Sequence, residues 1–204
     1  MKSINSDTQT KLIKRNVRLK GITDIMFDRY PGDNNTKLDW NQKMYLKGDT
    51  LVIPTTNMVS FLSAHNTNSA PKRLRDSRQF KKIANSCLSY VIINGADDMP
   101  GYIPFTSNGE RVVVGDFGPL FDEKSGVYLH RSVARLEKGI PNPKERPVLP
   151  APWELEFRLD IFPNREIKEQ EVKNLISDGG VAIGLGTFRG VFGKFTIDEW
   201  SELD

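Results

Sequence analysis

Cysteine and histidine are scarce in this chain of 204 residues, which has one cysteine, Cys87, and two histidines, His65 and His130. A single cysteine excludes an internal disulfide and indicates a reducing, cytoplasmic compartment. With so few thiol and imidazole groups, we expect no structural zinc site, no other metal and no cofactor. Asp97 and Asp98 are adjacent carboxylates, but no third carboxylate follows at a readable spacing, so they predict an exposed turn.

Long apolar runs are also missing. No stretch approaches the roughly 18 residues that a membrane-spanning helix needs. The first residues, MKSINSDTQTKLIKRN, are polar and lack the apolar segment of a secretory signal, so we expect neither a signal nor a membrane partner. The chain does have 38% hydrophobic and 27% charged residues, which is sufficient for a packed core. We expect a flexible tail over residues 1–15 and a single domain over 16–204, with an insertion at about 66–150.

Hydrophobic periodicity predicts the order of the secondary structure. The clearest pattern is WELEFRLDIF, in which five apolar residues alternate with charged ones and predict a half-buried strand. The proline-rich EKGIPNPKERPVLPAP predicts an extended connector. The expected elements are a strand over 16–27, a hairpin around Gly48, a helix over 54–65, a β-rich insertion over 85–135, a strand over 153–162, a helix over 167–178 with Gly179 as its C-cap, and a strand over 193–200.

This order indicates an α+β protein. If the insertion contributes one further strand, the plan is βαββαβ, the ferredoxin-like or RRM-type fold. Two helices then cover one face of a four-stranded antiparallel sheet. The other face, or the loops at one edge, is left available for binding.

Basic charge is concentrated in one segment. The net charge is only +3, yet PKRLRDSRQFKK, residues 71–82, has six basic residues against one acidic residue. Focused basic charge favours a nucleic-acid partner. We interpret the segment as a mobile basic arm that contacts phosphates; the alternative is a solvated charged helix or loop. Its basic residues are Lys72, Arg73, Arg75, Arg78, Lys81 and Lys82.

Glycine is concentrated near the end of the sequence shown, in GGVAIGLGTFRGVFGKF. A dinucleotide-binding or P-loop motif is excluded, because a helix precedes the glycines, a strand follows them and no Gly-Lys-Ser/Thr is present. The glycines either bring backbone N–H groups against phosphates or form a bulged turn between helix and strand. The residues of the first interpretation are Gly184, Gly186, Gly190 and Gly193, with Arg189 and Lys194 supplying charge.

Further candidates lie on other predicted elements. His130, Arg131 and Arg135 are on a predicted strand that either lines a nucleic-acid groove or forms an exposed sheet edge. Tyr30, beside Arg29 in a polar loop, is a candidate for stacking on a base. The three tryptophans have positions typical of structural residues.

Two motifs and their order resemble the RAMP superfamily of CRISPR-associated proteins, and within it the Cas7 backbone subunits. LVIPTTNMVSFLSAH is similar to the family's first strand-to-helix junction, although Thr55, Thr56 and Asn57 replace the usual small residues. GLGTFRGVFGKF is similar to its glycine-rich loop before the last strand. The long insertion resembles the region that forms the Cas7 thumb. Small Cas7-like proteins also occur in phages and mobile elements.

The resemblance implies a function. It implies a non-enzymatic protein that binds single-stranded nucleic acid, RNA before DNA, without sequence preference. Copies would assemble side by side into a helical filament along the strand, alone or with other CRISPR-type subunits. Two alternatives remain open: an endoribonuclease acting through His65 or a loop aspartate, Asp33 or Asp39, and a phage structural or interaction protein that binds no nucleic acid.

Overall fold

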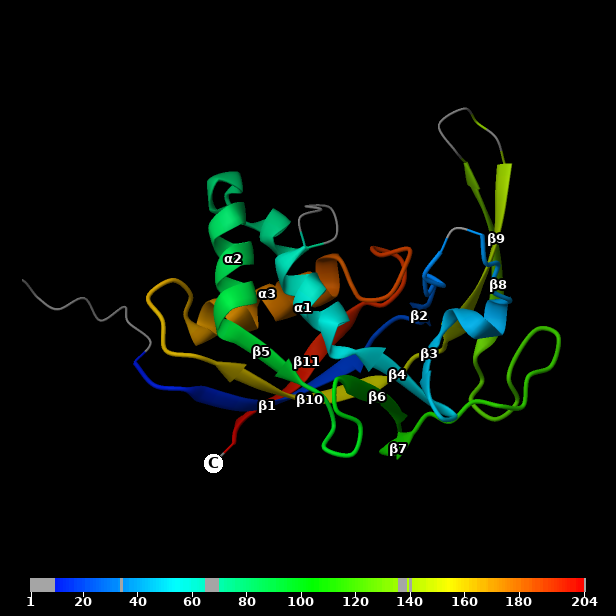
Figure 1. Cartoon of the computed structure of the whole chain (residues 1–204), viewed down its shortest axis with the longest axis horizontal. Helices are drawn as coiled ribbons and strands as arrows, with labels where there is room; N and C mark the ends of the chain where they lie inside the picture. Colours follow the sequence, from blue (N-terminus) through cyan, green and yellow to red (C-terminus); the bar gives the residue numbers. More distant parts are fainter. Residues whose placement is uncertain (1–9, 34, 65–69, 136–138, 140, 204) are drawn as a thin grey trace, which may run out of the picture.

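The protein is built on one large antiparallel sheet covered on one face by helices (Figure 1). The computed structural model describes residues 10–33, 35–64, 70–135, 139 and 141–203. In this part of the chain the large sheet comprises β1 (Ile13–Gly21), β3 (Tyr45–Lys47), β4 (Thr50–Pro54), β5 (Val91–Asn94), β6 (Tyr102–Ser107), β7 (Glu110–Arg111), β10 (Glu154–Ile161) and β11 (Phe195–Glu202). The α-helices are α1 (Thr55–Ser63), α2 (Phe80–Tyr90) and α3 (Glu169–Ala182), and short 3-10 turns are η1 (Trp40–Lys43), η3 (Pro71–Leu74) and η4 (Ser77–Gln79).

Four strands and the helices reproduce the predicted ferredoxin-like core. The strands lie in the order β11-β1-β10-β5, and every neighbouring pair is antiparallel. The helices of the first half, α1 and α2, come between β1 and β5, and α3 connects β10 to β11. The α+β prediction is therefore confirmed. The strand that the insertion was expected to supply is β5, and β6, β4 and β3 extend the sheet beyond β10.

Alternation along β10 positions the core as predicted. Leu155, Phe157, Leu159 and Ile161 are buried beneath the helices, while the charged residues between them face the open side of the sheet. Trp153 is fully buried and contacts Phe105 and Phe195 edge-on, which confirms its structural role. Burial of aromatic rings of this size is a major source of stability.

Two helices differ from the prediction. The segment before β5 was expected to be β-rich, but residues 80–90 form α2, because Ile83, Ala84 and Cys87 recur at helical spacing and face the core. Burial raises the pKa of the Cys87 thiol to about 12, so it is an inert core residue. The C-cap prediction at Gly179 is also wrong. Helix α3 continues to Ala182, so Gly179 lies inside the helix. Because Gly179 has no side chain, the helix can approach Pro71 and Phe61 closely.

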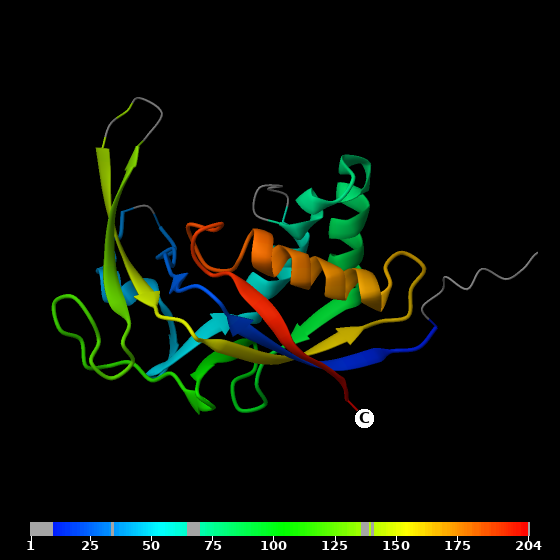
Figure 2. The ribbon, with the colours of Figure 1, turned by 180° about the vertical axis from the view of Figure 1, so that it is seen from behind.

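The predicted connector is a strand. Residues 141–149 form β9, which pairs with β8 (Tyr128–Arg135) in a long hairpin and with the short β2 (Ile25–Met26) at its base. The prolines at positions 141, 143 and 147 follow one another at intervals of two and four residues, so their backbone nitrogens all point to the same side of β9. That side faces away from β8, and the hydrogen bonds between β8 and β9 therefore need no N–H from a proline. The hairpin stands on the same side of the large sheet as the helices (Figures 1 and 2).

Two predicted boundaries also change. The strand expected over 16–27 is two strands, β1 and β2, in different sheets. Strand β1 begins at Ile13, so residues 13–15 belong to the sheet and not to a tail. Because α2 and β5 are part of the core, the segment inserted between core strands runs from 95 to 153. Within the described residues, no helix combines the length and apolarity required to cross a bilayer.

Candidate nucleic-acid interface

The open face of the sheet is occupied by paired charges. Arg18 Nε contacts Asp198 Oδ2 at 2.8 Å, and Asn16 Nδ2 donates to Glu156 Oε1 at 2.9 Å. Strands β1 and β5 contain no aromatic residue, and the one aromatic of β10, Phe157, is in the core. These three strands therefore offer no ring on which a base could stack.

The predicted basic arm is not a mobile segment. Residues 71–82 form η3, η4 and the start of α2, which pack against α1 and α3. Arg75 bridges two carboxylates of α3, with Nε 2.9 Å from Glu171 Oε1 and Nη2 3.1 Å from Asp178 Oδ2. Lys72 is only 3% exposed. Of the six basic residues, Arg75 is thus paired with carboxylates of α3.

The other basic residues of this segment have local contacts. Arg78 pairs with Asp76 two residues earlier, and Lys82 Nζ lies 3.2 Å from Glu166 Oε2. Arg73 Nη2 donates to the carbonyl of Ala182 at 3.4 Å, whereas Lys81 is exposed on α2. Their binding of nucleic acid stays a prediction.

The glycine-rich loop, residues 183–194, uses its amides internally. Gly184 N donates to Gly179 O at 2.9 Å, Gly190 N to Ile183 O at 2.7 Å and Gly193 N to Asp24 O at 2.7 Å. The amides of three of the four predicted glycines are therefore already used within the protein, and the contact of these glycines with phosphates stays a prediction. The glycines are required for positive φ and close packing: φ is +75° at Gly186, where a Cβ would collide with the carbonyl of Met26.

This loop presents apolar side chains to solvent. Phe188 and Val191 are more than half exposed at its tip. Phe192 packs edge-on against His130 of β8, with ring centroids 5.4 Å apart. Arg189 turns back on the loop, where its Nε donates to Gly186 O at 3.0 Å and burial lowers its pKa, and Lys194 N donates to Thr23 Oγ1. Two predicted sites, the glycine-rich loop and the His130 strand, are therefore in contact.

The link between β1 and β2 holds the loop and the hairpin in place. The carboxylate of Asp24 accepts from Tyr128 OH at 2.8 Å and from Ala151 N at 3.0 Å, while its carbonyl accepts from Gly193. Burial and the hydrogen bond to Asp24 raise the pKa of Tyr128 to about 12, so the phenol remains a donor at neutral pH. One short connection thus fixes the base of the hairpin relative to the glycine-rich loop.

Pairing in the hairpin decides which side chains face this loop. Directly opposite residues of an antiparallel pair share a face. His130 is opposite Arg146 and Ser132 is opposite Lys144, so all four lie on the face that contacts Phe192.

The other face of the hairpin carries Arg131, which the sequence had also singled out. Arg131 is opposite Glu145, and its Nε contacts Glu145 Oε1 at 2.9 Å. Arg135 ends β8 opposite Pro141. Arg131 therefore does not belong to the hairpin face that contacts the glycine-rich loop. Binding of nucleic acid by Arg131 and Arg135 stays a prediction.

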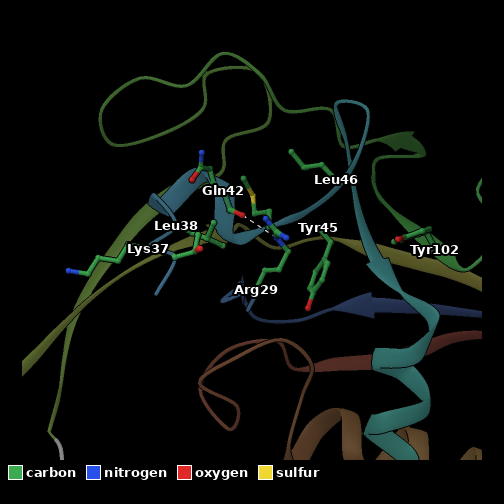
Figure 3. A pocket seen from close by; sticks show the side chains of 9 residues that line it. Arg29, Lys37, Leu38, Gln42, Tyr45, Leu46 and Tyr102 are labelled. Atoms are coloured by element: carbon green, nitrogen blue, oxygen red, sulfur yellow. Dashed lines mark hydrogen bonds between the residues drawn. The ribbon is translucent and has the colours of Figure 1, made fainter. Parts of the chain in front are cut away.

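Next to the hairpin lie two adjoining hollows with an excess of positive charge, which we call the basic hollow. One, of about 680 Å³, is shown in Figure 3, where Arg29 donates from Nε to Gln42 O at 3.3 Å. The other, of about 500 Å³, shares Arg29 and Lys37 with the first and continues to the hairpin. The charged residues that line the two hollows are four cations and one carboxylate: Arg29, Lys37, Lys43, Lys144 and Asp28.

The carboxylate of Asp28 does not neutralise the positive charge of the four cations that line the hollow. Asp28 Oδ2 accepts from Arg146 Nε at 2.7 Å, so its charge is already balanced by an arginine outside the lining. Lys43 Nζ donates to the carbonyl of Glu145 at 2.7 Å and ties the hollow to the hairpin. Tyr30, 60% exposed, also lines the hollow, as its stacking prediction requires. Sequence reasoning missed Lys37, Lys43 and Lys144 because they come from segments without local charge excess.

The two loop aspartates that were candidates for catalysis have structural contacts. Asp33 accepts from the amides of Asn35 and Thr36, both at 2.7 Å, and these bonds with the Thr36 hydroxyl lower its pKa. Asp39 caps η1. Both aspartates therefore form turns, and His65 lies outside the described residues. Among the described residues no three histidine, cysteine or acidic side chains gather as metal ligands.

The chain's sequence matches no protein-family profile and no curated protein. Its structure is similar to a chain in the cryo-EM structure of the Type III-B Cmr-beta bound to cognate target RNA, with a TM-score of 0.52 and 10% sequence identity. The similarity is one of fold. It covers 95% of this chain but only 61% of the other, so the protein spans about three fifths of the length of the chain that it matches.

Proposed function

We propose that the protein is a Cas7-like member of the RAMP superfamily. It binds single-stranded nucleic acid without sequence preference, and RNA is favoured over DNA as the ligand. The observation that carries this proposal is the basic hollow between the first loop and the β8–β9 hairpin, where four cations face one neutralised carboxylate. Lysine and arginine side chains around a hollow are suited to phosphates, and phosphate contacts carry no sequence information. An exposed tyrosine at the same place suits an unpaired base.

Two further observations support the proposal. The fold is shared with a chain in the structure of the Type III-B Cmr-beta bound to cognate target RNA. The projecting hairpin also lies in the segment that the family resemblance associates with the thumb. By the same resemblance, copies of the protein would assemble side by side along the strand, alone or with other CRISPR-type subunits.

Charge reversal at two positions tests the proposed site. Lys37 and Lys144 line the hollow, and neither has a carboxylate within ion-pair distance among the described residues. We expect Lys37→Glu with Lys144→Glu to weaken binding of a fluorescein-labelled single-stranded RNA at least tenfold in fluorescence anisotropy. The reason is that two phosphate contacts become repulsive.

A control variant carries the same change of charge elsewhere. Lys14→Glu with Lys20→Glu alters the open sheet face and should bind within about threefold of the wild type, since a surface charge outside the site acts only through screened solvent. A comparison variant, Arg78→Glu with Lys81→Glu, tests the predicted basic segment on the α2 side. A larger loss in either variant than in the hollow variant would move the interface away from the hollow.

Assembly is tested separately by size-exclusion mass measurement with and without RNA. A large species that collapses after nuclease treatment or in high salt is the expected result. An RNA-independent oligomer, with no binding of labelled strands, would favour the structural or interaction protein. RNA cleavage that is lost in His65→Ala or Asp33→Ala would favour the endoribonuclease.

A further inference from the structure

Phe188 has an unusual backbone conformation for its residue type. Among the described residues only Asn108 and Phe188 combine a side chain with positive φ, at +52° and +53°. Asn108 precedes Gly109 in a tight turn, where asparagine is common. A bulky aromatic residue in the left-handed region is rare and strained.

Burial of the ring does not account for the strain. The residue is 57% exposed, and its ring contacts Phe192 only in a tilted arrangement, with centroids 6.0 Å apart. The flanking backbone fixes the conformation, because Thr187 N donates to Met26 O at 2.9 Å and Phe192 N donates to Phe188 O at 3.3 Å. The loop thus presents one large aromatic ring to solvent from a backbone that hydrogen bonds hold in place. Strain that the surroundings maintain is typical of functional positions.

The ring lies on the side of the molecule that carries the basic hollow. Phe188 packs on Phe192, and Phe192 packs on His130. His130 shares its hairpin face with Lys144, which lines the hollow. The glycine-rich loop therefore contacts the same hairpin face that carries Lys144.

We infer that Phe188 is a stacking platform for an unpaired nucleobase of the strand held in the basic hollow. This inference rests on the proposed function and adds the contact made by the bases. Every base has a π-face, so a single ring accepts any of the four without reading its edge. A base in a duplex has both faces covered by its neighbours, so the platform also selects single strands.

Replacing the ring by a residue that keeps the backbone conformation tests the inference. Phe188→Asn removes the ring, and asparagine tolerates positive φ, so the loop should keep its shape and the thermal stability should not fall. The dissociation constant for a single-stranded RNA should rise at least about fivefold, the lower end of the effect of one stacked base. Phe188→Trp, which keeps an aromatic ring at this position, should bind with the affinity of the wild type.

A neighbouring residue provides the matched control. Val191 is exposed to the same degree, 58%, on the same loop, but it has no π-face. Val191→Asn should bind as the wild type does. With 2-aminopurine in the RNA at saturating protein, the wild type and Phe188→Trp should quench its fluorescence, whereas Phe188→Asn should leave it brighter.

The outcomes separate the inference from the proposed function. If the wild type binds RNA and Phe188→Asn binds equally well with equal quenching, the stacking platform is overturned and the basic hollow stands. Equal losses in Phe188→Asn and Val191→Asn would also overturn it, because loss of apolar surface would then explain both. If the wild type binds no RNA, the proposed function itself is wrong.

Discussion

At the scale of single residues, two glycines of the glycine-rich loop allow the energetic cost of backbone strain to be measured apart from the cost of a steric collision. Both have positive φ, +91° at Gly190 and +74° at Gly193. A Cβ at Gly190 would meet nothing within 4 Å, whereas at Gly193 it would collide with the carbonyl of Leu185. We expect Gly190→Ala to lower the free energy of unfolding by about 1 kcal/mol, the cost of the left-handed conformation.

Gly193→Ala should cost at least about 2 kcal/mol more, because the backbone of Leu185 has to move. Urea denaturation of the two variants measures the difference. Equal losses would mean that the loop does not have the compact form in which Gly193 N donates to Asp24 and Leu185 N donates to Gly193.

At the scale of elements, the docking of α3 rests on a glycine inside the helix. In an exposed helix, Gly→Ala stabilises by about 0.5–1 kcal/mol. A Cβ at Gly179, however, would lie within 3 Å of Pro71 and Phe61. Because proline is rigid and both neighbours are buried, we expect Gly179→Ala to destabilise the protein by about 1–3 kcal/mol, as overpacked cores do. An increase in the melting temperature would contradict the close approach of α3.

The start of α3 is attached to β1 by an ion pair that makes stability depend on pH. Arg15 Nε lies 2.7 Å from Glu169 Oε1, and Trp200 Nε1 donates to the same oxygen at 2.7 Å. Partial burial tends to raise the pKa of Glu169, but the hydrogen bonds from Arg15 and Trp200 and the nearby positive charges outweigh it and lower the pKa. The stabilisation is therefore complete above the ordinary value near 4.5 and is lost as the pH falls through the lowered pKa.

Glu169→Gln should accordingly be less stable than the wild type at pH 7, and this difference in stability should shrink as the pH falls below about 4.5, through the lowered pKa of Glu169. Glu202→Gln is the control, since this carboxylate also faces Arg15 but is 79% exposed and 3.6 Å away. It should change stability little at any pH. Chemical denaturation at pH 7 and at acidic pH measures the free energy of unfolding of each variant. If the difference between Glu169→Gln and the wild type stays constant with pH, the result would count against the ion pair.

Elements with one clear periodicity could be predicted from the sequence, and mixed ones could not. Strand β10 has strict alternation, and the Asn108–Gly109 turn determines its own hairpin, so both required only local information. Helix α2 was missed because its apolar residues continue without a break into β5. The prolines of β9 suggested a connector, since the partner strand that tolerates them is visible only in the fold.

At the scale of the whole molecule, basic side chains gather in space at a different place from the one where they gather in the sequence. The most basic segment of the sequence is docked on α3, where Arg75 contacts Glu171 and Asp178. The basic hollow is assembled from separate segments with little net charge of their own. Sequence reasoning therefore singled out Tyr30 as a candidate but not the cations that line the hollow with it, because their proximity is a product of tertiary structure.

The salt dependence of RNA binding tests whether this assembled hollow is the interface. For single strands, the slope of log K against log salt changes by about 0.7 for each phosphate contact. The slope is measured by anisotropy between 50 and 300 mM salt for the wild type and for Lys37→Ala with Lys144→Ala. The proposed interface predicts tight, salt-sensitive binding by the wild type and a slope that is shallower by about 1.4 in the variant. An unchanged slope in the variant, or no binding by the wild type at the lowest salt, would contradict it.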